Sequence, residues 1–265
     1  MGEAMAADGD VLIASGVGMV FNADSANPVR ALGDISFGLR KSEVLAIVGP
    51  SGCGKTTLFN IIAGLITPSQ GSVSVNGVQV AGAKGHVGYM LQKDMLLPWR
   101  SVLDNVTLGL EVRGVSRAES VEIAHRLITS YGLGGFENAK PATLSGGMRQ
   151  RVAFMRTLAF DPDVILLDEP FSALDFQTRL LLQGEVQRII RERGKSVILV
   201  THDIGEAITM ADRIVVMTNR PATVKCVHTI ELSDSERDPV TIRTNPLYNQ
   251  YFNQIWSELE IRREI

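Results

Sequence analysis

Short runs of apolar, largely β-branched residues alternate along the chain with longer segments in which apolar residues recur every three or four positions. Continuous apolar runs bounded by Gly, Pro or Asp are typical of strands that a parallel sheet buries on both faces, and the longer segments are typical of amphipathic helices. The alternation of the two predicts an α/β fold with a parallel core. The strands are expected at 43–49, 163–170, 196–203 and 213–217, and the helices at 55–65, 101–112, 117–131, 146–160, 175–193 and 204–211.

The first 40 residues and the segment 71–90 follow a different pattern. Here alternate residues are apolar, as in Ile35, Phe37 and Leu39, and the pair Asn76-Gly77 has the composition of a hairpin turn. An antiparallel β layer is therefore expected beside the parallel core.

The residues from 231 to the C-terminus divide into two parts. Residues 231–245 are polar and are expected to form a linker. Asn245 followed by Pro246 is a suitable start for a helix, and apolar residues recur after it at helical spacing. We expect one amphipathic helix, which either packs on the core or faces a partner; its apolar positions are Leu247, Tyr251, Ile255 and Leu259, beside Tyr248, Phe252 and Trp256.

Composition narrows the class of protein. The chain has 265 residues, of which 45% are hydrophobic and 21% charged, with a formal net charge of −3. These values indicate a globular protein without the overall excess of positive charge that is typical of nucleic-acid-binding proteins. The two cysteines, Cys53 and Cys226, exclude a disulfide framework, and neither has a second ligand at a recognised metal-binding spacing.

Targeting signals and membrane spans are not expected either. The acidic opening residues lack the features of a secretory signal, and the apolar runs are far shorter than the roughly 18 residues that cross a bilayer. We therefore expect a cytosolic protein that does not itself span a membrane.

A phosphate-binding loop follows the apolar run 44–48. The segment satisfies the pattern G-x-x-x-x-G-K-[ST] and opens an apolar helix, so its backbone N–H groups can curl around a triphosphate. Lys55 is expected to reach the β and γ phosphates, and Thr56 to coordinate Mg²⁺. The expected nucleotide-binding residues of the loop are Gly49, Pro50, Ser51, Gly52, Cys53, Gly54, Lys55, Thr56 and Thr57.

Two adjacent carboxylates end the strand expected at 163–170. A carboxylate at the end of a buried strand is costly unless a cation meets it, so Asp168 is expected in the Mg²⁺ shell. Glu169 would then lie near the γ phosphate, where it could act as the base for the attacking water. Together with the phosphate-binding loop, these residues predict a nucleoside triphosphatase.

A second anion-binding helix end is predicted at Leu144 to Arg151, the stretch LSGGMRQR. Ser145, Gly146 and Gly147 offer a hydroxyl and backbone N–H groups at the start of a helix. One triphosphate cannot readily satisfy two such ends of a single chain. A dimer with shared nucleotides resolves the difficulty.

With these motifs the chain resembles the ATP-binding cassette family over residues 11–230. LSGGMRQR resembles the family's signature, Gln92 its Q-loop, residues 172–175 its D-loop and His202 its switch histidine, all in the family's order and spacing. The resemblance implies a P-loop ATPase with a RecA-like parallel core, an antiparallel β subdomain and an inserted helical subdomain at about 93–160.

The resemblance also implies how the nucleotide is bound and hydrolysed. In this family a head-to-tail dimer holds each ATP between the phosphate-binding loop of one subunit and the signature of the other. By resemblance, Gln92 contacts Mg²⁺ or the attacking water, His202 holds the γ phosphate and that water, and Phe21 stacks on adenine.

Residues 96–102, LLPWRSV, resemble the importer subunits for nitrate, sulfonate, taurine and related substrates. The implied partners are a second copy of the chain, integral membrane permease subunits and a substrate-binding protein, with the chain peripheral on the cytoplasmic face of the membrane. Leu96, Leu97 and Trp99 are expected to be exposed and to seat a helix of the permease; the alternative is ordinary packing inside the helical subdomain. The alternatives are a motor for a lipid-handling or export complex and a soluble ABC ATPase without a transport role.

Overall fold

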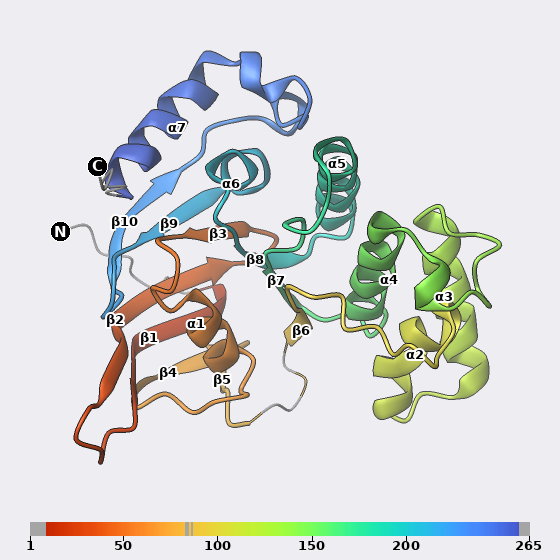
Figure 1. Ribbon diagram of the computed structural model, residues 1–265, viewed down its shortest axis with the longest axis horizontal. Helices are drawn as coiled ribbons and strands as arrows, with labels where there is room; N and C mark the ends of the chain where they lie inside the picture. Colours follow the sequence, from red (N-terminus) through yellow and green to blue (C-terminus); the bar gives the residue numbers. More distant parts are fainter. Residues whose placement is uncertain (1–8, 83–84, 86, 260–265) are drawn as a thin grey trace.

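The structure, a computed structural model, describes residues 9–82, 85 and 87–259. Its strands form two sheets, with a group of helices standing beyond the larger one (Figure 1). The expectations that concern the opening residues 1–8 and the end of the tail, residues 260–265, lie outside the described residues.

The larger sheet is the expected parallel core. Its strands are β3 (Val44–Val48), β6 (Val87–Met90), β7 (Val164–Asp168), β8 (Ser196–Val200), β9 (Arg213–Met217) and β10 (Val224–Thr229). They lie in the order β10-β9-β3-β8-β7-β6, and all neighbours are parallel except β10, which pairs antiparallel with β9. The four predicted strands are confirmed, whereas the edge strand β10 was not anticipated.

Helices cover both faces of this sheet, as buried strands require. Alternate residues of β3 point to opposite sides: Val44, Ala46 and Val48 pack with α5 (Phe176–Glu192) and α6 (Ile204–Met210), and Leu45 and Ile47 pack with α1 (Lys55–Ile62). The first of these apolar clusters continues into the inserted helices, and the second continues into the smaller sheet. The α/β prediction is therefore confirmed.

The smaller sheet is antiparallel and consists of β1 (Asp10–Phe21), β2 (Val29–Arg40), β4 (Gln70–Val75) and β5 (Val78–Gln79), in the order β2-β1-β4-β5. Asn76 and Gly77 form its predicted tight turn, with φ angles of 49° and 74°. The assignment of all of 71–90 to this layer was wrong, because β6 pairs parallel with β7 in the core. Gly88 permits this pairing, since a Cβ there would lie 2.7 Å from the side chain of Pro162.

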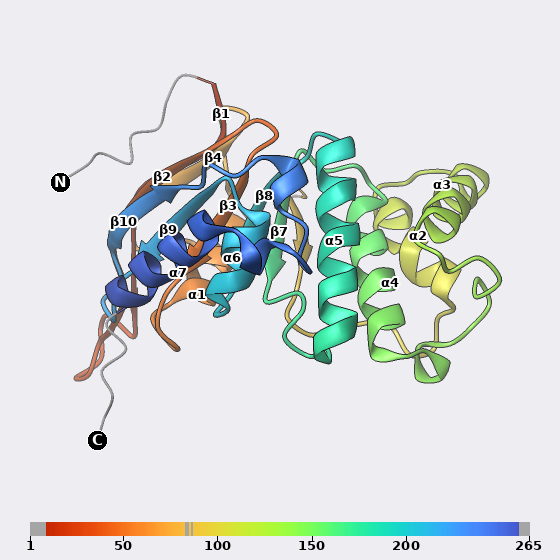
Figure 2. The same ribbon diagram turned by 90° about the horizontal axis from the view of Figure 1, so that it is seen from above.

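Three helices lie between β6 and β7 in the chain. They are α2 (Val102–Val112), α3 (Arg117–Ser130) and α4 (Gly146–Leu158), and they stand on the far side of α5 from the antiparallel sheet in both views (Figures 1 and 2). Serine side chains cap all three, at Ser101, Ser116 and Ser145. The predicted helices of this segment are confirmed.

The C-terminal segment returns to the core and ends in α7 (Pro246–Glu258). The buried guanidinium of Arg237 holds the preceding polar stretch by donating to the carbonyl oxygens of Leu232, Ala211 and Ile230. Helix α7 lies beside α6 and β10 (Figure 2), with Ile255 fully buried. The amphipathic helix is confirmed. Tyr248 and Ile255 of its apolar stripe are buried against the core, whereas Leu247 and Trp256 are exposed.

None of the helices in the described part of the chain is long and apolar enough to cross a membrane.

Candidate functional site

The loop between β3 and α1 has the shape that its sequence predicts. Gly52 and Gly54 have φ angles of 73° and 125°, which side-chain-bearing residues rarely adopt. A Cβ on Gly54 would also lie 2.7 Å from the side chain of Leu32, so glycine is required there for space as well. The loop therefore curls tightly into the start of α1.

Lys55 is buried within this curl. Its Nζ donates to the carbonyl oxygens of Gly49, at 2.8 Å, and Pro50, at 3.0 Å. Because the N-cap residue of α1 is a glycine, the first N–H groups of the helix have no capping side chain and face a prospective anion. Arg220, which the sequence did not single out, donates from Nε to the carbonyl oxygen of Gly52 and so adds a second cation beside the loop.

Asp168 ends β7 close to the loop, with only 5% of the residue exposed. Burial, followed by the charge of Glu169, raises the pKa of its carboxyl group, while Tyr89, Lys55 and Thr56 counteract the rise. The structure thus brings together Thr56 and Asp168, the two residues predicted to bind metal from the loop and β7. A desolvated carboxylate beside a hydroxyl is a donor set that fits Mg²⁺, because a hard cation prefers oxygen ligands and offsets the burial of the charge.

Tyr89 on β6 is a member of this site that sequence reasoning missed. Its hydroxyl donates to Oδ2 of Asp168 at 3.4 Å, and burial together with Asp168 raises the pKa of the phenol. The hydroxyl therefore stays protonated and steadies the carboxylate. Only its place in the strand before Gln92 could have indicated this role.

One carboxylate oxygen of Glu169 joins the three residues that the sequence predicts as catalytic, because Gln92 and His202 both approach it. Oε2 of Glu169 accepts a hydrogen bond from Nε2 of Gln92 at 2.9 Å and lies 3.3 Å from Nδ1 of His202. Glu169 adopts a left-handed backbone conformation, with φ of 46°, and its N–H donates to the carbonyl oxygen of Val200 at 2.8 Å. This strained turn directs the side chain away from the strand, and such strain is common at functional sites.

Ser145 caps α4 through a hydrogen bond from the N–H of Met148. Gly147 lies against α5, where a Cβ would come within 2.8 Å of the Thr178 methyl group, so this approach admits only glycine. Helix α4 lies well apart from α1 along the long axis of the molecule in both views (Figures 1 and 2). The two predicted anion-binding helices of one chain are thus separate features of its surface.

The segment after Gln92 is attached to α4. Arg149 pairs with Asp94, with Nε and Oδ2 separated by 3.1 Å, and Arg156 donates to the carbonyl oxygens of Asp94 and Met95. The residues beyond Gln92 are therefore fixed to the helix that begins at Ser145.

Three apolar side chains of 96–102 were expected to be exposed, and this expectation was wrong for Leu96. Leu96 is only 8% exposed and packs in the core of the inserted helices, whereas Trp99 is 71% exposed and Leu97 is half-buried. Leu96 turns inward because its neighbour Leu97 is fixed by Asn105, whose Oδ1 accepts from the Leu97 N–H at 2.8 Å. Met95, 56% exposed, accompanies Trp99 at the surface.

Phe21 is the last residue of β1 and is half-buried against the apolar cluster that includes α1. Two residues earlier, Met19 pairs with Leu32, the residue that lies under Gly54. The strand thus carries Phe21 toward the side of the phosphate-binding loop, and its role in adenine binding remains a prediction.

Glu206 is a second buried carboxyl that the sequence analysis did not single out. Its Oε2 accepts from the Thr201 hydroxyl at 3.1 Å, and within the described residues its Oε1 has no hydrogen-bond partner. Burial, reinforced by Asp203, raises the pKa of Glu206 to about 8. The group therefore carries a proton at neutral pH, directly behind the turn that presents His202. The Asp-x-x-Glu spacing of a capping box at 203–206 could have marked it.

Replacing Glu206 with Gln is expected to change how stability depends on pH. In the folded chain the proton leaves near pH 8, but in the unfolded chain it leaves near the ordinary value of 4.5. Unfolding between these values releases a proton, so the wild-type free energy of unfolding falls as the pH rises through this window. Glu206→Gln should remove that fall. Between pH 5 and pH 8 the free energy of unfolding of the variant should therefore rise by about 1 kcal/mol or more relative to that of the wild type. Urea unfolding at both pH values measures the difference, and parallel profiles for the two proteins would contradict the assignment.

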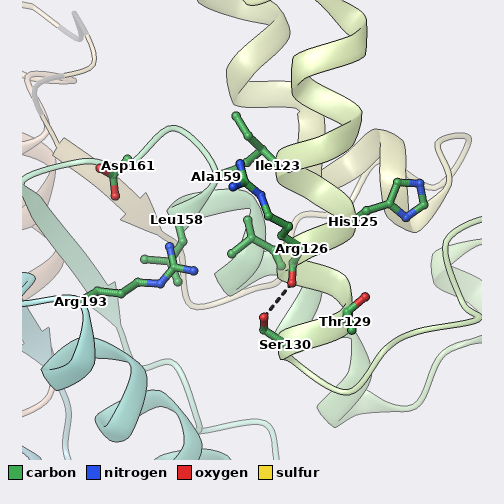
Figure 3. Close-up of a pocket in the computed structure, with 10 residues that line it drawn as sticks. Ile123, His125, Arg126, Thr129, Ser130, Leu158, Ala159, Asp161 and Arg193 are labelled. Atoms are coloured by element: carbon green, nitrogen blue, oxygen red, sulfur yellow. Dashed lines mark hydrogen bonds between the residues drawn. The ribbon is translucent and has the colours of Figure 1, made fainter.

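An open cavity of 820 Å³ lies away from these residues, between α3 and the ends of α4 and α5 (Figure 3). Arg126 and Arg193 extend toward it, and the Ser130 hydroxyl donates to the carbonyl oxygen of Arg126 at 2.8 Å. The predicted nucleotide and metal residues do not line it. The cavity therefore does not belong to the site described above.

Comparisons with known proteins identify the family of the chain. The family model described as ABC transporter matches residues 32–172. An uncharacterized ABC transporter ATP-binding protein of Bacillus subtilis, YtlC, is 47% identical over 229 residues, covering 86% of this chain and 88% of its own. The taurine import ATP-binding protein TauB of Escherichia coli is 45% identical over 194 residues, covering 73% of this chain and 76% of its own.

Solved structures give the same result. The dimeric structure of a bacterial ABC transporter cassette aligns with a TM-score of 0.73 at 29% identity, covering 84% of this chain and all of that one. A post-hydrolysis dimer of such a cassette, bound to ADP and Pi, aligns with a TM-score of 0.72 over the same shares.

Proposed function

Because this chain belongs to the ABC transporter family of ATP-binding proteins, and is an ATP-binding, ATP-hydrolysing protein of that family, we propose that it is the motor subunit of an importer. The importer is of the nitrate, sulfonate and taurine type. The observation that carries the motor function is the convergence of Gln92 and His202 on Glu169, beside the phosphate-binding loop.

The phosphate-binding loop and α1 bind the triphosphate. The backbone N–H groups of this loop and of the first turn of α1 surround the phosphates, and Lys55 turns from the carbonyl oxygens of Gly49 and Pro50 toward the β and γ phosphates. Thr56, Asp168 and Gln92 would hold Mg²⁺, which neutralises charge on the transferred phosphoryl group when bound. Phe21 contacts adenine from the end of β1.

Glu169 accepts the proton of the attacking water. A carboxylate held at one oxygen by Gln92 and His202 is oriented for this role, and neighbouring Asp168 is buried and committed to the metal side of the site. The imidazole of His202 is exposed and able to reach a γ phosphate once it leaves Glu169. Together with Lys55 it balances the charge that develops on the γ phosphoryl oxygens.

Two copies of the chain assemble head to tail around two nucleotides. The separation of α4 from α1 supports this arrangement, since Ser145, Gly146 and Gly147 are then free to bind the γ phosphate of the partner's ATP. The triphosphate holds the dimer closed, and loss of the γ phosphate lets it open. This cycle drives transport.

The closed dimer acts on integral membrane permease subunits at the cytoplasmic face of the membrane, where the chain is peripheral. A substrate-binding protein delivers the substrate from the other side. The exposed side chains of Trp99 and of Met95, four residues earlier, support a docking surface for a permease helix, because large exposed apolar side chains of this kind mark protein interfaces.

Replacing Trp99 with Ala is expected to weaken binding to the permease by about 30-fold or more, the loss typical of a central interface aromatic, while ATP affinity stays unchanged. Co-purification of the subunits and ATP titration measure the two effects. Trp256→Ala is the matched control, because that indole is also exposed, at 50%, but lies on α7. Full co-purification of Trp99→Ala would count against this docking surface.

The importer hypothesis is tested by identifying the proteins that co-purify with the chain from detergent-solubilised membranes of its own cell. We expect a permease together with a substrate-binding protein. Recovery of an export or lipid-handling permease, or of a fully active ATPase with no membrane partner, would replace this proposal with one of the alternatives.

A further inference from the structure

Three different ligand-type side chains meet where α7 crosses the edge strand β10. Cys226 and His228 are two residues apart and so share one face of the strand, and Glu258 comes from the last turn of α7. One donor atom of each lies within 4.8 Å of the others. No second ligand stands at a recognised metal-binding spacing from Cys226 in the sequence, and the cluster is completed only by Glu258, 32 positions further along the chain.

The packing of α7 fixes the position of Glu258. Ile255 is fully buried one turn earlier, and Tyr251, two turns earlier, accepts a hydrogen bond from the N–H of Glu231 at 3.1 Å. Lys225 of β10 donates from Nζ to the carbonyl oxygen of Glu258 at 2.7 Å. The helix thus presents its buried face, and with it the carboxylate, to the strand.

We propose that Cys226, His228 and Glu258 bind a divalent transition metal of the zinc class. A thiolate, an imidazole and a carboxylate are the ligands that Zn²⁺ takes in proteins, whereas Mg²⁺ and Ca²⁺ take oxygen ligands. Three protein ligands leave the fourth tetrahedral position for a water molecule.

The donor spacing supports a tetrahedral site. Zn–S and Zn–N bonds of usual length at a tetrahedral angle place the sulfur and nitrogen about 3.5 Å apart. Sγ of Cys226 and Nε2 of His228 are separated by 3.5 Å, and Nε2 of His228 and Oε2 of Glu258 by 3.5 Å. The thiol of Cys226 also contacts Oε2 of Glu258.

Metal binding here involves no electron transfer. The thiol of Cys226 releases its proton to solvent, and the sulfur, imidazole and carboxylate each donate a lone pair to the ion. The ion would cross-link strand β10 to helix α7. This site is independent of the nucleotide site, and its test uses neither ATP nor a permease.

The test is metal binding by the whole chain, purified without a histidine tag, stripped with a chelator and kept free of nucleotide. Equilibrium dialysis against Zn²⁺ should give one ion per chain, and Co²⁺ should produce a thiolate-to-cobalt charge-transfer band. In Cys226→Ser the band should vanish. The affinity for Zn²⁺ should fall by more than about 100-fold, because losing a residue that only supports a ligand already costs about 10–100-fold. Glu258→Gln should lower the affinity while keeping the shape of the side chain.

Matched controls separate this cluster from other metal-binding groups. Cys53→Ser removes the other thiol and His125→Asn a histidine outside the cluster, and both should bind Zn²⁺ as the wild type does. Zn²⁺ should also raise the Tm of the wild type but not that of Cys226→Ser. The proposal is overturned if the wild type binds no more Zn²⁺ than Cys226→Ser, or if the cobalt band survives that substitution.

Discussion

The variant Glu169→Gln is expected to hydrolyse ATP about 10²–10⁴-fold more slowly than the wild type while binding ATP with similar affinity. The loss follows from the proposed role of the carboxylate, because an amide cannot accept the proton of the attacking water at neutral pH.

The surroundings of Glu169 explain why this substitution should leave the site intact. The amide oxygen of Gln can still accept from Nε2 of Gln92, and it can accept from Nδ1 of His202 as well. The left-handed backbone at position 169 depends on the hydrogen bond from its N–H to Val200, which the substitution does not touch. ATP should therefore bind and remain, so the closed dimer accumulates.

Phosphate release and light scattering with Mg-ATP measure these two effects. Glu192→Gln is a suitable control, since Glu192 forms an exposed pair with Arg188 on α5, and it should behave as the wild type. Wild-type turnover by Glu169→Gln would exclude Glu169 as the base, and a purely monomeric variant under Mg-ATP would contradict the proposed dimer.

Lys55→Ala is expected to weaken ATP binding itself, by about 30-fold or more. Removing one partner of a desolvated charge pair typically costs 2–5 kcal/mol, and about 1.4 kcal/mol corresponds to a tenfold change in affinity. The effect should be large because Lys55 is buried in the loop and its Nζ is already directed to the carbonyl oxygens beside the phosphate site.

Calorimetric titration with Mg-ATP measures the loss, and circular dichroism checks that α1 has formed. Lys41→Ala removes an exposed lysine from the turn before β3 and should leave the affinity unchanged. Equal affinities of Lys55→Ala and wild type would remove Lys55 from the phosphate site.

The parts of the site that sequence predicts well are encoded locally. A glycine-rich turn between a buried strand and an apolar helix, and a carboxylate pair at the end of another strand, each form from consecutive residues, so reading them requires no knowledge of distant contacts. The four core strands were predicted for the same reason, since each is a continuous apolar run between turn residues.

The features that were missed depend on contacts between distant segments. Residues 87–90 form too short a run to reveal which sheet they join, and their place is set by parallel pairing with the distant strand β7. Leu96 is buried because Asn105 fixes the backbone next to it. The burial of Glu206, as distinct from its capping-box spacing, and the cluster around Cys226 become visible only once helices α6 and α7 are placed against the core.

The attachment of the Gln92 segment to α4 has a consequence for the proposed dimer. Arg149 and Arg156 tie Asp94 and Met95 to α4, whose first residues are proposed to bind the partner's nucleotide. In that dimer, a shift of α4 on engaging one ATP would be passed to Gln92, which contacts Glu169 of the other site. The proposed dimer would in this way link its two sites mechanically, which is the physical requirement for cooperative turnover.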